Sequence, residues 1–471
     1  MPKRNVLLLL LITTISLVSW LARDQGRQAR QIGEVLGAIE RSYLEPVDAE
    51  LLEAAAVEGI MAKLDEHSAL VAGAARRELE AALDQEFGGV GLELMASAEG
   101  IVVHAPLVDG PAWRAGVRAG DMIASIDGVD TRGMSVRDAV DILRGDVGST
   151  VAVGLRRASS GSGIDGAGPA DDSRMVTLVR EIVRTESVLG DRRRPDGTWD
   201  WFVEGEPGIA CVRITSCGDR TLAELDAALA TIAAAPALQG LVLDLRGNPG
   251  GLLGVAIDVC DRFLDDGVIV STRRRGSGGA VVVEPRRATP GSTLAGVPIA
   301  VLIDGLTASA AEIVAACLQD HGRAVIVGSR SFGKGTVQSI IPLSDGRRLL
   351  KLTTAEYVRP DETSVQRRGG EPGWGVAPDV GREVDLTGDV REAHRAWRRR
   401  RDMLPETSPH HEASPPSAGD LPRGMDPALA LAIDAIVSAA ADFRGEEEAA
   451  GDADEAAAAR DAPGPLDGRG G

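Results

Sequence analysis

The sequence predicts a multidomain protein that combines N-terminal helices, a small β domain and an α/β core. Strand and helix patterns alternate through residues 175–385, which is typical of a largely parallel sheet with helices packed on it. Short apolar runs separated by glycines fill residues 85–157, as expected for a small β domain. The length of 471 residues is enough for about three domains.

The composition excludes several classes of protein. Lys and Arg number 51 and Asp and Glu number 70, so the formal net charge is −19. Because neutralising phosphates needs a basic surface, we expect no nucleic-acid partner. The four cysteines are too few for a disulfide scaffold and form no CxxC pair that would indicate a zinc or redox site.

Residues 1–24 have the layout of a secretory signal. Lys3 and Arg4 precede the 17 uncharged residues 6–22. Cleavage after Ala22 would leave Trp20 at a position where a small residue is preferred. We therefore expect an uncleaved anchor in the inner membrane, with the rest of the chain exported to the periplasmic side of the cell envelope. A cleaved signal peptide is the alternative.

The remaining chain divides into five regions by pattern. Apolar residues recur at helical spacing in the first region, where Asp48 is a predicted N-cap. The second has one predicted helix near 135–143. The last has one over 426–442, which we expect to dock on the core, within what is otherwise mostly solvated linker. In chain order the regions are the N-terminal helices (25–84), the β domain (85–157), a flexible insertion (158–174), the α/β core (175–385) and a low-complexity tail (386–471).

A serine and a lysine of the core have the features of a nucleophile and its base. Residues 298–303 are predicted as a strand and 310–318 as a helix, so Ser309 lies at a helix N-terminus, where negative charge is stabilised. A serine there is either an N-cap or a nucleophile. Lys334 lies between two glycines in an apolar neighbourhood, and a lysine sheltered from water loses its proton more readily. A neutral amine activates a serine hydroxyl, whereas the alternative is a surface lysine in a turn.

Four motifs in the core belong together. They are DLRGNPGG at 244–251, TASAAEI at 307–313, LQD at 318–320 and FGKGTVQ at 332–338. With this set the chain resembles the carboxyl-terminal processing (tail-specific) serine proteases of the S41 type, in which the serine and the lysine are spaced as Ser309 and Lys334 are here (334 − 309 = 25). The likeness spans roughly residues 30–385 and includes LDEHS at 64–68, where Glu66 replaces the family's usual proline.

The resemblance implies a role for three side chains. Ser309 would attack the scissile carbonyl, and Lys334 would act as general base and then as general acid to the leaving amine. Gln338 would orient Lys334. The family chemistry requires neither a metal nor an organic cofactor.

The resemblance also implies the donors of an oxyanion hole. The backbone N–H of Ala310 would be one donor, and the turn at residues 249–251 would supply the other. Gly250 is the expected second donor, although the resemblance does not separate it from Gly251.

Residues 85–157 resemble a PDZ domain of the permuted bacterial kind. The sequence GVGL at 89–92 matches the carboxylate-binding loop, whose N–H groups capture a terminal carboxylate while the peptide adds a strand beside it. The helix at 136–143 would form the other wall of the groove. The alternative is a small β domain whose glycines only make turns. The residues implied in peptide binding are Gly89, Val90, Gly91, Leu92, Val140 and Leu143.

These features together predict an exported serine endopeptidase that cleaves proteins recognised by their C-terminal tails. Its expected partners are protein substrates with free, apolar C-termini and, at the N-terminal segment, the membrane. An adaptor protein and a homo-oligomer are left open. The alternative is a catalytically silent, PDZ-containing peptide-binding scaffold, which would have no need to keep Ser309, Lys334 and Gln338 together.

Overall fold

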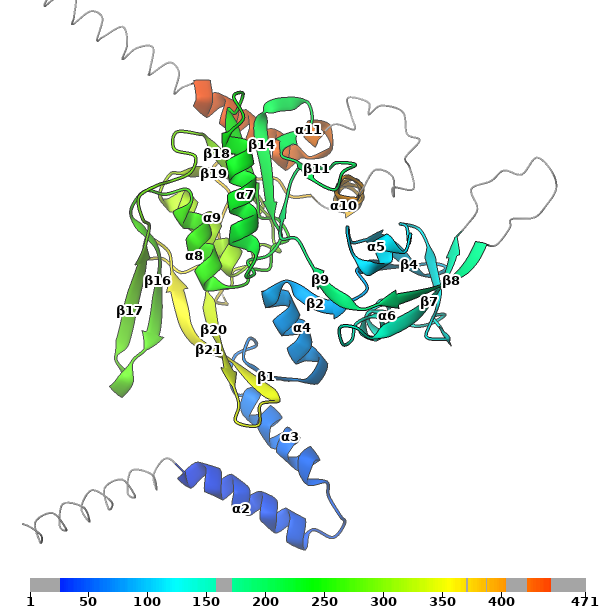
Figure 1. Cartoon of the computed structure of the whole chain (residues 1–471). Coiled ribbons are helices and arrows are strands. Elements are labelled where there is room, and N and C mark those ends of the chain that lie inside the picture. The colour runs from blue at the N-terminus through cyan, green and yellow to red at the C-terminus, as the bar shows by residue number, and fades with distance from the viewer. Residues whose placement is uncertain (1–25, 158–171, 370–371, 387, 404–421, 442–471) are drawn as a thin grey trace, which may run out of the picture. The chain divides into compact units, whose positions relative to one another are not determined.

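The computed structural model of the chain describes residues 26–157, 172–369, 372–386, 388–403 and 422–441 (Figure 1). They form two compact units, one made of the N-terminal residues up to Arg76 with Gln338–Thr353, the other of the rest. Within the described ranges, no helix is long and apolar enough to cross a membrane. The anchor predicted at 1–24 lies outside those ranges.

The first unit combines helices with a small antiparallel sheet. The Asp48 carboxylate accepts the N–H of Glu50 at 2.9 Å, so the predicted N-cap is confirmed. The elements are α2 (Arg27–Ser42), α3 (Ala49–Met61) and β1 (Ala69–Ala72), with most of β20 (Thr336–Pro342) and the first half of β21 (Arg348–Val358), which pairs with β1. The helix α4 (Gly73–Asp84) leads into the second unit.

The β domain of the second unit is an antiparallel sheet in the order β3-β4-β5-β7-β8, with β6 paired to β5. Two short helices pack against it around a core that includes Ile101, Ile126 and Leu155. The elements are β2 (Glu86–Gly89), β3 (Leu92–Ser97), β4 (Gly100–Pro106), α5 (Pro111–Arg114), β5 (Met122–Ile126), β6 (Val129–Asp130), α6 (Val136–Leu143), β7 (Thr150–Arg157), β8 (Asp172–Val179) and β9 (Glu181–Arg184), which pairs with β2.

The strand β8 makes the β domain longer than predicted. It pairs with β7 from Thr150↔Val179 to Arg157↔Asp172, so the predicted boundary at residue 175 falls inside this sheet. The alternation of exposed Met175 with buried Leu178 marks a half-buried strand, and such a pattern does not say which sheet the strand joins.

The α/β core is built on the four parallel strands β14-β15-β18-β19. The central strands β15 and β18 are apolar and buried along their whole length, apart from the polar end of β15, as parallel strands covered on both faces must be. The elements are β10 (Val188–Leu189), β11 (Arg192–Arg193), β12 (Trp199–Asp200), β13 (Phe202–Val203), β14 (Glu206–Ile214), α7 (Thr221–Ala233), β15 (Gly240–Asp244), α8 (Leu253–Asp261), β16 (Val268–Arg275), η1 (Ser277–Gly279), β17 (Val281–Arg287), β18 (Ile299–Ile303), α9 (Ala310–Asp320) and β19 (Ala324–Gly328).

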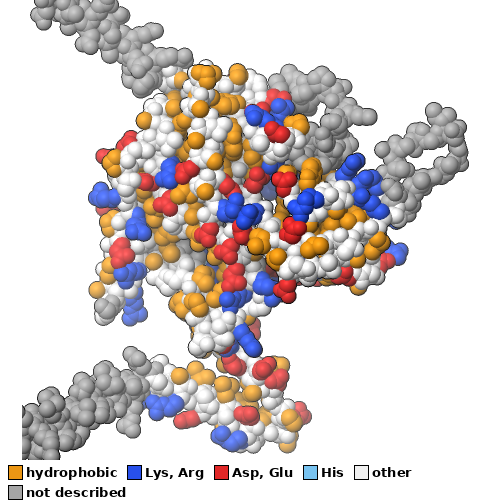
Figure 2. Space-filling view, viewed as in Figure 1, with side chains coloured by type: hydrophobic (Ala, Val, Ile, Leu, Met, Phe, Trp, Pro, Cys, Tyr) orange, Lys and Arg blue, Asp and Glu red, His pale blue; other side chains and the backbone are white. Residues whose placement is uncertain are grey.

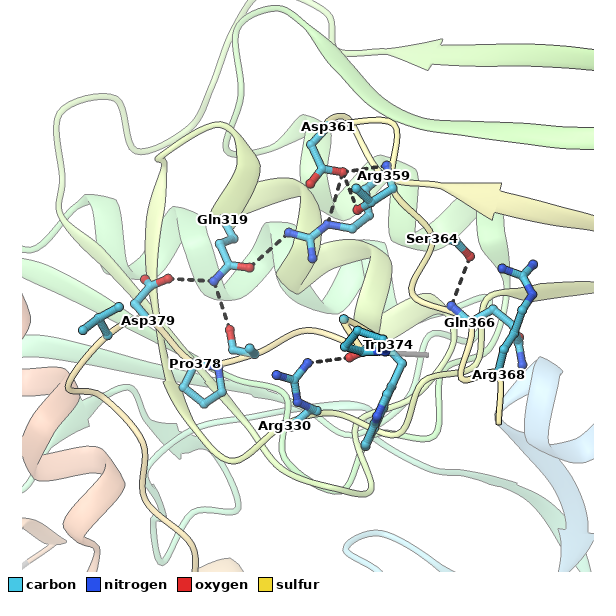
Figure 3. A pocket seen from close by; sticks show the side chains of 16 residues that line it. Gln319, Arg330, Arg359, Asp361, Ser364, Gln366, Arg368, Trp374, Pro378 and Asp379 are labelled. Atoms are coloured by element: carbon cyan, nitrogen blue, oxygen red, sulfur yellow. Dashed lines mark hydrogen bonds and ion pairs between the residues drawn. The ribbon is translucent and has the colours of Figure 1, made fainter. Parts of the chain in front are cut away.

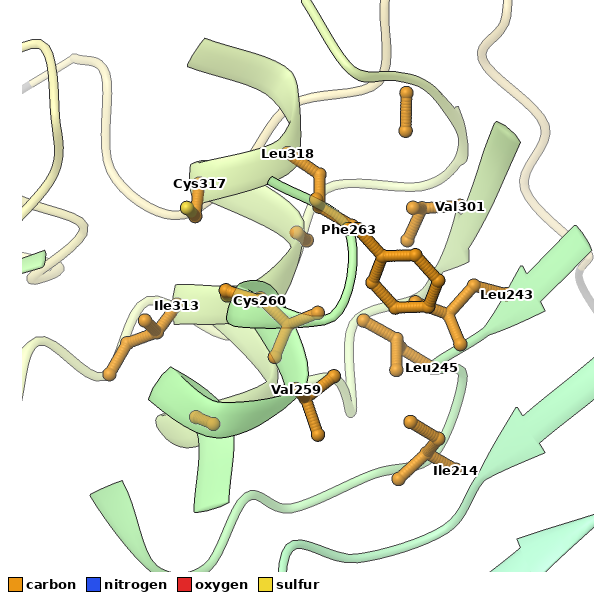
Figure 4. Packing of buried hydrophobic residues seen from close by; sticks show 14 of the residues in the cluster. Ile214, Leu243, Leu245, Val259, Cys260, Phe263, Val301, Ile313, Cys317 and Leu318 are labelled. Carbon is orange, nitrogen blue, oxygen red and sulfur yellow. The ribbon is translucent and has the colours of Figure 1, made fainter. Parts of the chain in front are cut away.

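Alternate side chains of each parallel strand enter two separate cores. Leu243 and Val301 face α8 and α9 and surround Phe263 (Figure 4). Val242 and Leu302 face the opposite side, where a helix over residues 427–441 covers them. The predicted class of helices, PDZ-like β domain and α/β core, with a serine at a strand-to-helix turn, is confirmed.

The tail contributes more structure than a solvated linker. Besides the helix over 427–441, the described residues contain α10 (Gly388–Asp402) and the short α11 (Pro422–Met425). Asp402 of α10 receives two hydrogen bonds from Arg213, at 2.8 and 3.0 Å. The buried Asp426 receives hydrogen bonds from Arg246 and His394. Buried ion pairs therefore hold the C-terminal helices to the core.

Candidate active site

Ser309 lies at a strained turn between β18 and α9. Its φ of +56° and ψ of −118° are rarely adopted by residues other than glycine, and such strain gathers at functional sites. The turn is fixed by Asp304, whose Oδ1 accepts the N–H of Leu306 at 3.0 Å and that of Gly247 at 2.9 Å. The Thr307 hydroxyl donates to the Leu245 carbonyl at 2.9 Å. Ser309 therefore occupies the N-cap position of α9 in a conformation that costs energy.

Glu312 connects the serine to the lysine loop, a role that the sequence motifs did not reveal. Its carboxylate is fully buried, and Oε2 accepts the backbone N–H of both Ser309 and Lys334, each at 2.8 Å. The two nitrogens are therefore no more than 5.6 Å apart, twice 2.8 Å. Oε1 accepts from the Ser331 hydroxyl at 2.6 Å and the Gly333 N–H at 2.7 Å. Four donors thus converge on one carboxylate.

Burial determines the protonation behaviour of Glu312. Desolvation raises the pKa of its carboxyl above the ordinary value of 4.5, although the hydrogen bonds from Ser331, Lys334, Gly333 and Ser309 act in the opposite direction. Two sequence signals could have identified this residue: its place in the TASAAEI motif, and the pattern S-x-x-E, in which an N-cap serine precedes a glutamate by three residues.

Lys334 is half-buried, and the loop around it packs so tightly that only glycine fits at the positions before and after it. A Cβ on Gly333 would lie 2.8 Å from Cε3 of Trp374, and one on Gly335 would lie 2.8 Å from the backbone nitrogen of Gln366. Both glycines are therefore required by close approach. The predicted alternative of an exposed lysine in a surface turn is not what the structure contains.

Tyr357 is a second site residue that the motifs did not reveal. It is buried in β21, and its hydroxyl donates to the Lys334 carbonyl. Burial raises the pKa of Tyr357 well above its ordinary value, and the charge of Glu312 raises it further, while a hydrogen bond with the Ser309 side chain lowers it. The phenol thus contacts both halves of the predicted dyad.

The predicted oxyanion donors lie close to Ser309. A Cβ on Gly250 would be 2.8 Å from the Ser309 Cβ and 2.9 Å from the Ala310 nitrogen. The N–H of Gly250, however, donates to Asn248 Oδ1 at 2.8 Å. Among the described residues the N–H groups of Ala310 and Gly251 have no acceptor. Gly251, which the resemblance did not separate from Gly250, is therefore the glycine whose N–H is available.

Gln338 belongs to the first compact unit, whereas Ser309 and Lys334 belong to the second. Its Nε2 donates to Thr353 Oγ1 at 3.2 Å, and that hydroxyl donates to Asp65 Oδ1 at 3.0 Å. Asp65 begins the DEHS sequence and also accepts the Ser68 hydroxyl at 2.9 Å. These contacts connect two of the recognised motifs, and the role of Gln338 toward Lys334 stays a prediction.

All six residues predicted to bind peptide line one cavity of about 420 Å³ in the β domain. Phe87 and Arg144 also line it, and the Arg144 guanidinium lies over the Phe87 ring at 4.7 Å. The buried Nε of Arg144 has no hydrogen-bond partner, nor do the N–H groups of Val90 and Gly91 among the described residues. The groove therefore offers unused donors beside apolar walls.

No group of three or more His, Cys, Asp or Glu able to hold a metal ion occurs among the described residues. The site is built instead from a serine, a lysine, a buried carboxylate and backbone N–H groups. These groups suit acyl transfer, in which a nucleophile, a base and oxyanion donors must converge.

Comparison with known proteins agrees with this geometry. The profile of Peptidase family S41 matches residues 208–381, and that of the PDZ domain matches residues 102–157. The chain is 37% identical to a carboxy-terminal-processing protease of Bartonella bacilliformis over 357 residues, 75% of each protein. It is 32% identical to a carboxyl-terminal-processing protease of Picosynechococcus over 318 residues, 66% of this chain and 70% of that one. It is also 29% identical to the carboxy-terminal processing protease CtpA of Bacillus subtilis over 337 residues, 71% of this chain and 66% of that one. The chain therefore belongs to the carboxy-terminal processing proteases of peptidase family S41, and it is a serine-type peptidase with a PDZ domain.

Proposed function

We propose that the chain is an exported endopeptidase that cleaves proteins selected by their C-terminal tails and uses Ser309 and Lys334 as its catalytic dyad. The observation that carries the dyad is the shared acceptor Glu312 Oε2, which holds the backbone nitrogens of both residues within 5.6 Å, twice 2.8 Å.

In the proposed mechanism, the Lys334 amine takes the proton of the Ser309 hydroxyl as Oγ attacks the scissile carbonyl. The oxyanion that forms accepts hydrogen bonds from the N–H groups of Ala310 and Gly251, and each such donor is typically worth about 3 kcal/mol. Lys334 then returns the proton to the leaving amine. Water then attacks the acyl-enzyme while Lys334 takes its proton, and Lys334 returns a proton to Ser309 Oγ as the acyl group leaves.

Tail recognition is supported by the donors at one end of the PDZ groove. The N–H groups of Val90 and Gly91 and the guanidinium of Arg144 lie where a terminal carboxylate would be held. Val140 and Leu143 give the same cavity an apolar wall, which favours an apolar last side chain.

Export is supported by the sequence at the N-terminus, where Lys3 and Arg4 precede the uncharged residues 6–22. Adding protease to intact cells and to cells with an opened outer envelope tests it. We expect the chain to be digested only in the opened cells and to stay with the membrane fraction. Resistance in both preparations would contradict export.

The dyad is tested with the full chain and a loosely folded protein that ends in an apolar tail. Ser309→Ala and Lys334→Ala are each expected to lower kcat by about 10⁴- to 10⁶-fold, while the exposed control Lys63→Ala keeps the parent rate. Persistent cleavage by the Ser309→Ala variant would contradict the proposed dyad. Amidating the substrate's C-terminus tests tail recognition in the same assay, and equal rates for both forms would contradict it.

The scaffold alternative predicts that the parent protein binds the tail and cleaves nothing. Membership of a peptidase family, together with the intact Ser309, Glu312 and Lys334 arrangement, speaks against that alternative.

A further inference from the structure

A second large cavity lies at the carboxyl ends of the parallel strands. It measures about 770 Å³ and is bounded by the last residues of β14, β15, β18 and β19 and by one face of α10. Ligands of open α/β sheets bind at this edge. After β18, the residues Asp304, Gly305 and Leu306 form part of the cavity wall. They belong to the turn that continues to Ser309. The cavity therefore borders the segment that leads from β18 to Ser309.

The face of α10 toward this cavity is a stripe of arginines. Arg391, Arg395 and Arg399 are four residues apart, so they lie along one side of the helix, and all three line the cavity. Arg391 pairs with Asp385 at 3.3 Å, whereas no carboxylate among the described residues pairs with Arg395 or Arg399. Like charges four residues apart repel each other. The two exposed arginines are therefore left without a counter-charge within the described chain.

Arg330, which follows β19, also lines this cavity and adds to its positive charge. Its Nη1 donates to the Trp374 carbonyl at 2.6 Å, and no carboxylate among the described residues pairs with it (Figure 3). Of the acidic residues that line the cavity, Asp304 already accepts backbone N–H groups and Glu383 pairs with no arginine of the described chain. The other two acidic residues, Asp244 and Asp385, pair with Arg246 and Arg391. Three arginines without an ion pair in the described chain therefore line the cavity together with two carboxylates without one.

The arginine stripe also leads toward the peptide groove of the PDZ domain. Burial lowers the pKa of His104, which lines that groove, and the nearby charge of Arg399 lowers it further. Figure 1 shows α10 beside α5 and β4 of this domain. Arg399 therefore lies near the groove, while Arg395 and Arg330 line the cavity that reaches the Ser309 turn.

We propose that Arg395 and Arg399 of α10, with Arg330 of the same cavity, recognise acidic residues in the stretch of substrate between the tail held by the PDZ domain and the scissile bond. This inference rests on the proposed function, because it assumes that a bound tail leads the chain toward Ser309. Carboxylates on the substrate would supply the ion-pair partners that the three guanidinium groups lack among the described residues. On the face drawn in Figure 2, acidic and basic side chains are mixed, and the whole chain carries −19, so general attraction does not explain a preference for acidic substrates.

The test compares two substrates with the full chain. They share the same loosely folded body, cleaved segment and C-terminal tail, and differ only in a spacer of Asp and Glu or of Asn and Gln. We expect the acidic substrate to have the higher kcat/KM. The double variant Arg395→Gln/Arg399→Gln should lower the ratio of kcat/KM for the acidic substrate to that for the neutral substrate by about 3- to 10-fold. Arg400→Gln is the matched control, because Arg400 is exposed on the same helix and does not line the cavity. It should keep the ratio.

Binding separates failure of this inference from failure of the proposed function. The Kd of fluorescent spacer-tail peptides for Ser309→Ala reports recognition without chemistry, and it should show the same preference and the same loss in the double variant. A preference in binding without any cleavage would overturn the dyad and leave the recognition standing. Equal affinities and equal rates for the two spacers, or equal losses with Arg400→Gln, would overturn the inference.

A competing occupant is the chain's own end. Residues 442–471 contain nine acidic and three basic residues. If ending the chain at residue 441 and the double variant both raise the rate on both substrates without changing their ratio, the arginines hold this segment instead, and the inference about substrate is wrong.

Discussion

The Glu312 carboxylate accepts the backbone N–H of Lys334 at 2.8 Å, across 22 residues of sequence. The same oxygen accepts the N–H of Ser309, so one buried side chain holds the backbones of the two residues of the proposed dyad close together. Glu312 is a positioning residue in this arrangement, since its oxygens are occupied by four donors of the protein.

Replacing Glu312 by Gln should lower kcat by about 10²-fold, because a glutamine amide supplies one acceptor oxygen where the carboxylate supplies two. Whichever way the amide is turned, its NH₂ group faces two N–H or O–H donors. Measured kcat and KM should show the loss mainly in kcat. Glu224→Gln is the control, because Glu224 accepts hydrogen bonds from Ser187 and Val188 away from the site. A loss of kcat in Glu224→Gln as large as in Glu312→Gln would contradict the positioning role.

The raised pKa of Glu312 predicts a stability difference that depends on pH. Since burial raises the pKa of the folded carboxyl above 4.5, the folded state keeps a proton that the unfolded state has already lost. As the pH rises from 4.5 through the raised pKa, the unfolding free energy of the parent should fall relative to Glu312→Gln, and it should change no further above that pKa. Denaturant unfolding of both proteins between about pH 4 and pH 8 measures this difference. A parent that gains stability relative to the variant over this range would show that the hydrogen bonds outweigh the burial.

Adding one methyl group at Gly250 should lower kcat. The new Cβ would lie 2.8 Å from the Ser309 Cβ and 2.8 Å from the Ala308 carbonyl oxygen, so backbone beside the nucleophile would have to move. Gly247→Ala is a matched control, because Gly247 also has a positive φ, +73° against +95°, and open space around its Cβ position. We expect both variants to lose some stability and only Gly250→Ala to lose about 10²-fold in kcat. Equal kcat values for the two variants would contradict the close packing.

Much of the fold could be predicted from patterns along the chain. The buried strands β15 and β18 are unbroken apolar runs, and the strand, small-residue turn and helix around Ser309 are all local features. The β-domain boundary was less accurate, because β8 joins β7 across residues 158–171 and a half-buried strand does not reveal its partner.

The parts of the site that could not be predicted depend on contacts between distant residues. Glu312 has the local signature of an N-terminal helix residue, and only the loop around Lys334 makes it a shared acceptor. Tyr357 lies outside every recognised motif, and its contact with the Lys334 carbonyl exists only once β21 is paired. In α10, the run of arginines gave no indication that Trp397 is buried or that Arg401 pairs with Asp191.

The helix over residues 427–441 should be required for the stability of the core. Its buried Ile433 and Ala432 cover Val242, Ala300 and Leu302 on the face of the sheet opposite Phe263. Ile433→Ala should therefore lower the unfolding free energy by about 2–5 kcal/mol, because it removes apolar contacts and leaves a cavity.

Val437→Ala is the control for that substitution, because Val437 is on the same helix and 46% exposed. It should change the unfolding free energy by less than about 0.5 kcal/mol. Denaturant unfolding of the full chain with both variants measures the contrast. If Ile433→Ala were as harmless as Val437→Ala, the second face of the sheet would not depend on the C-terminal helix, and a chain ending before residue 422 should then keep the parent stability.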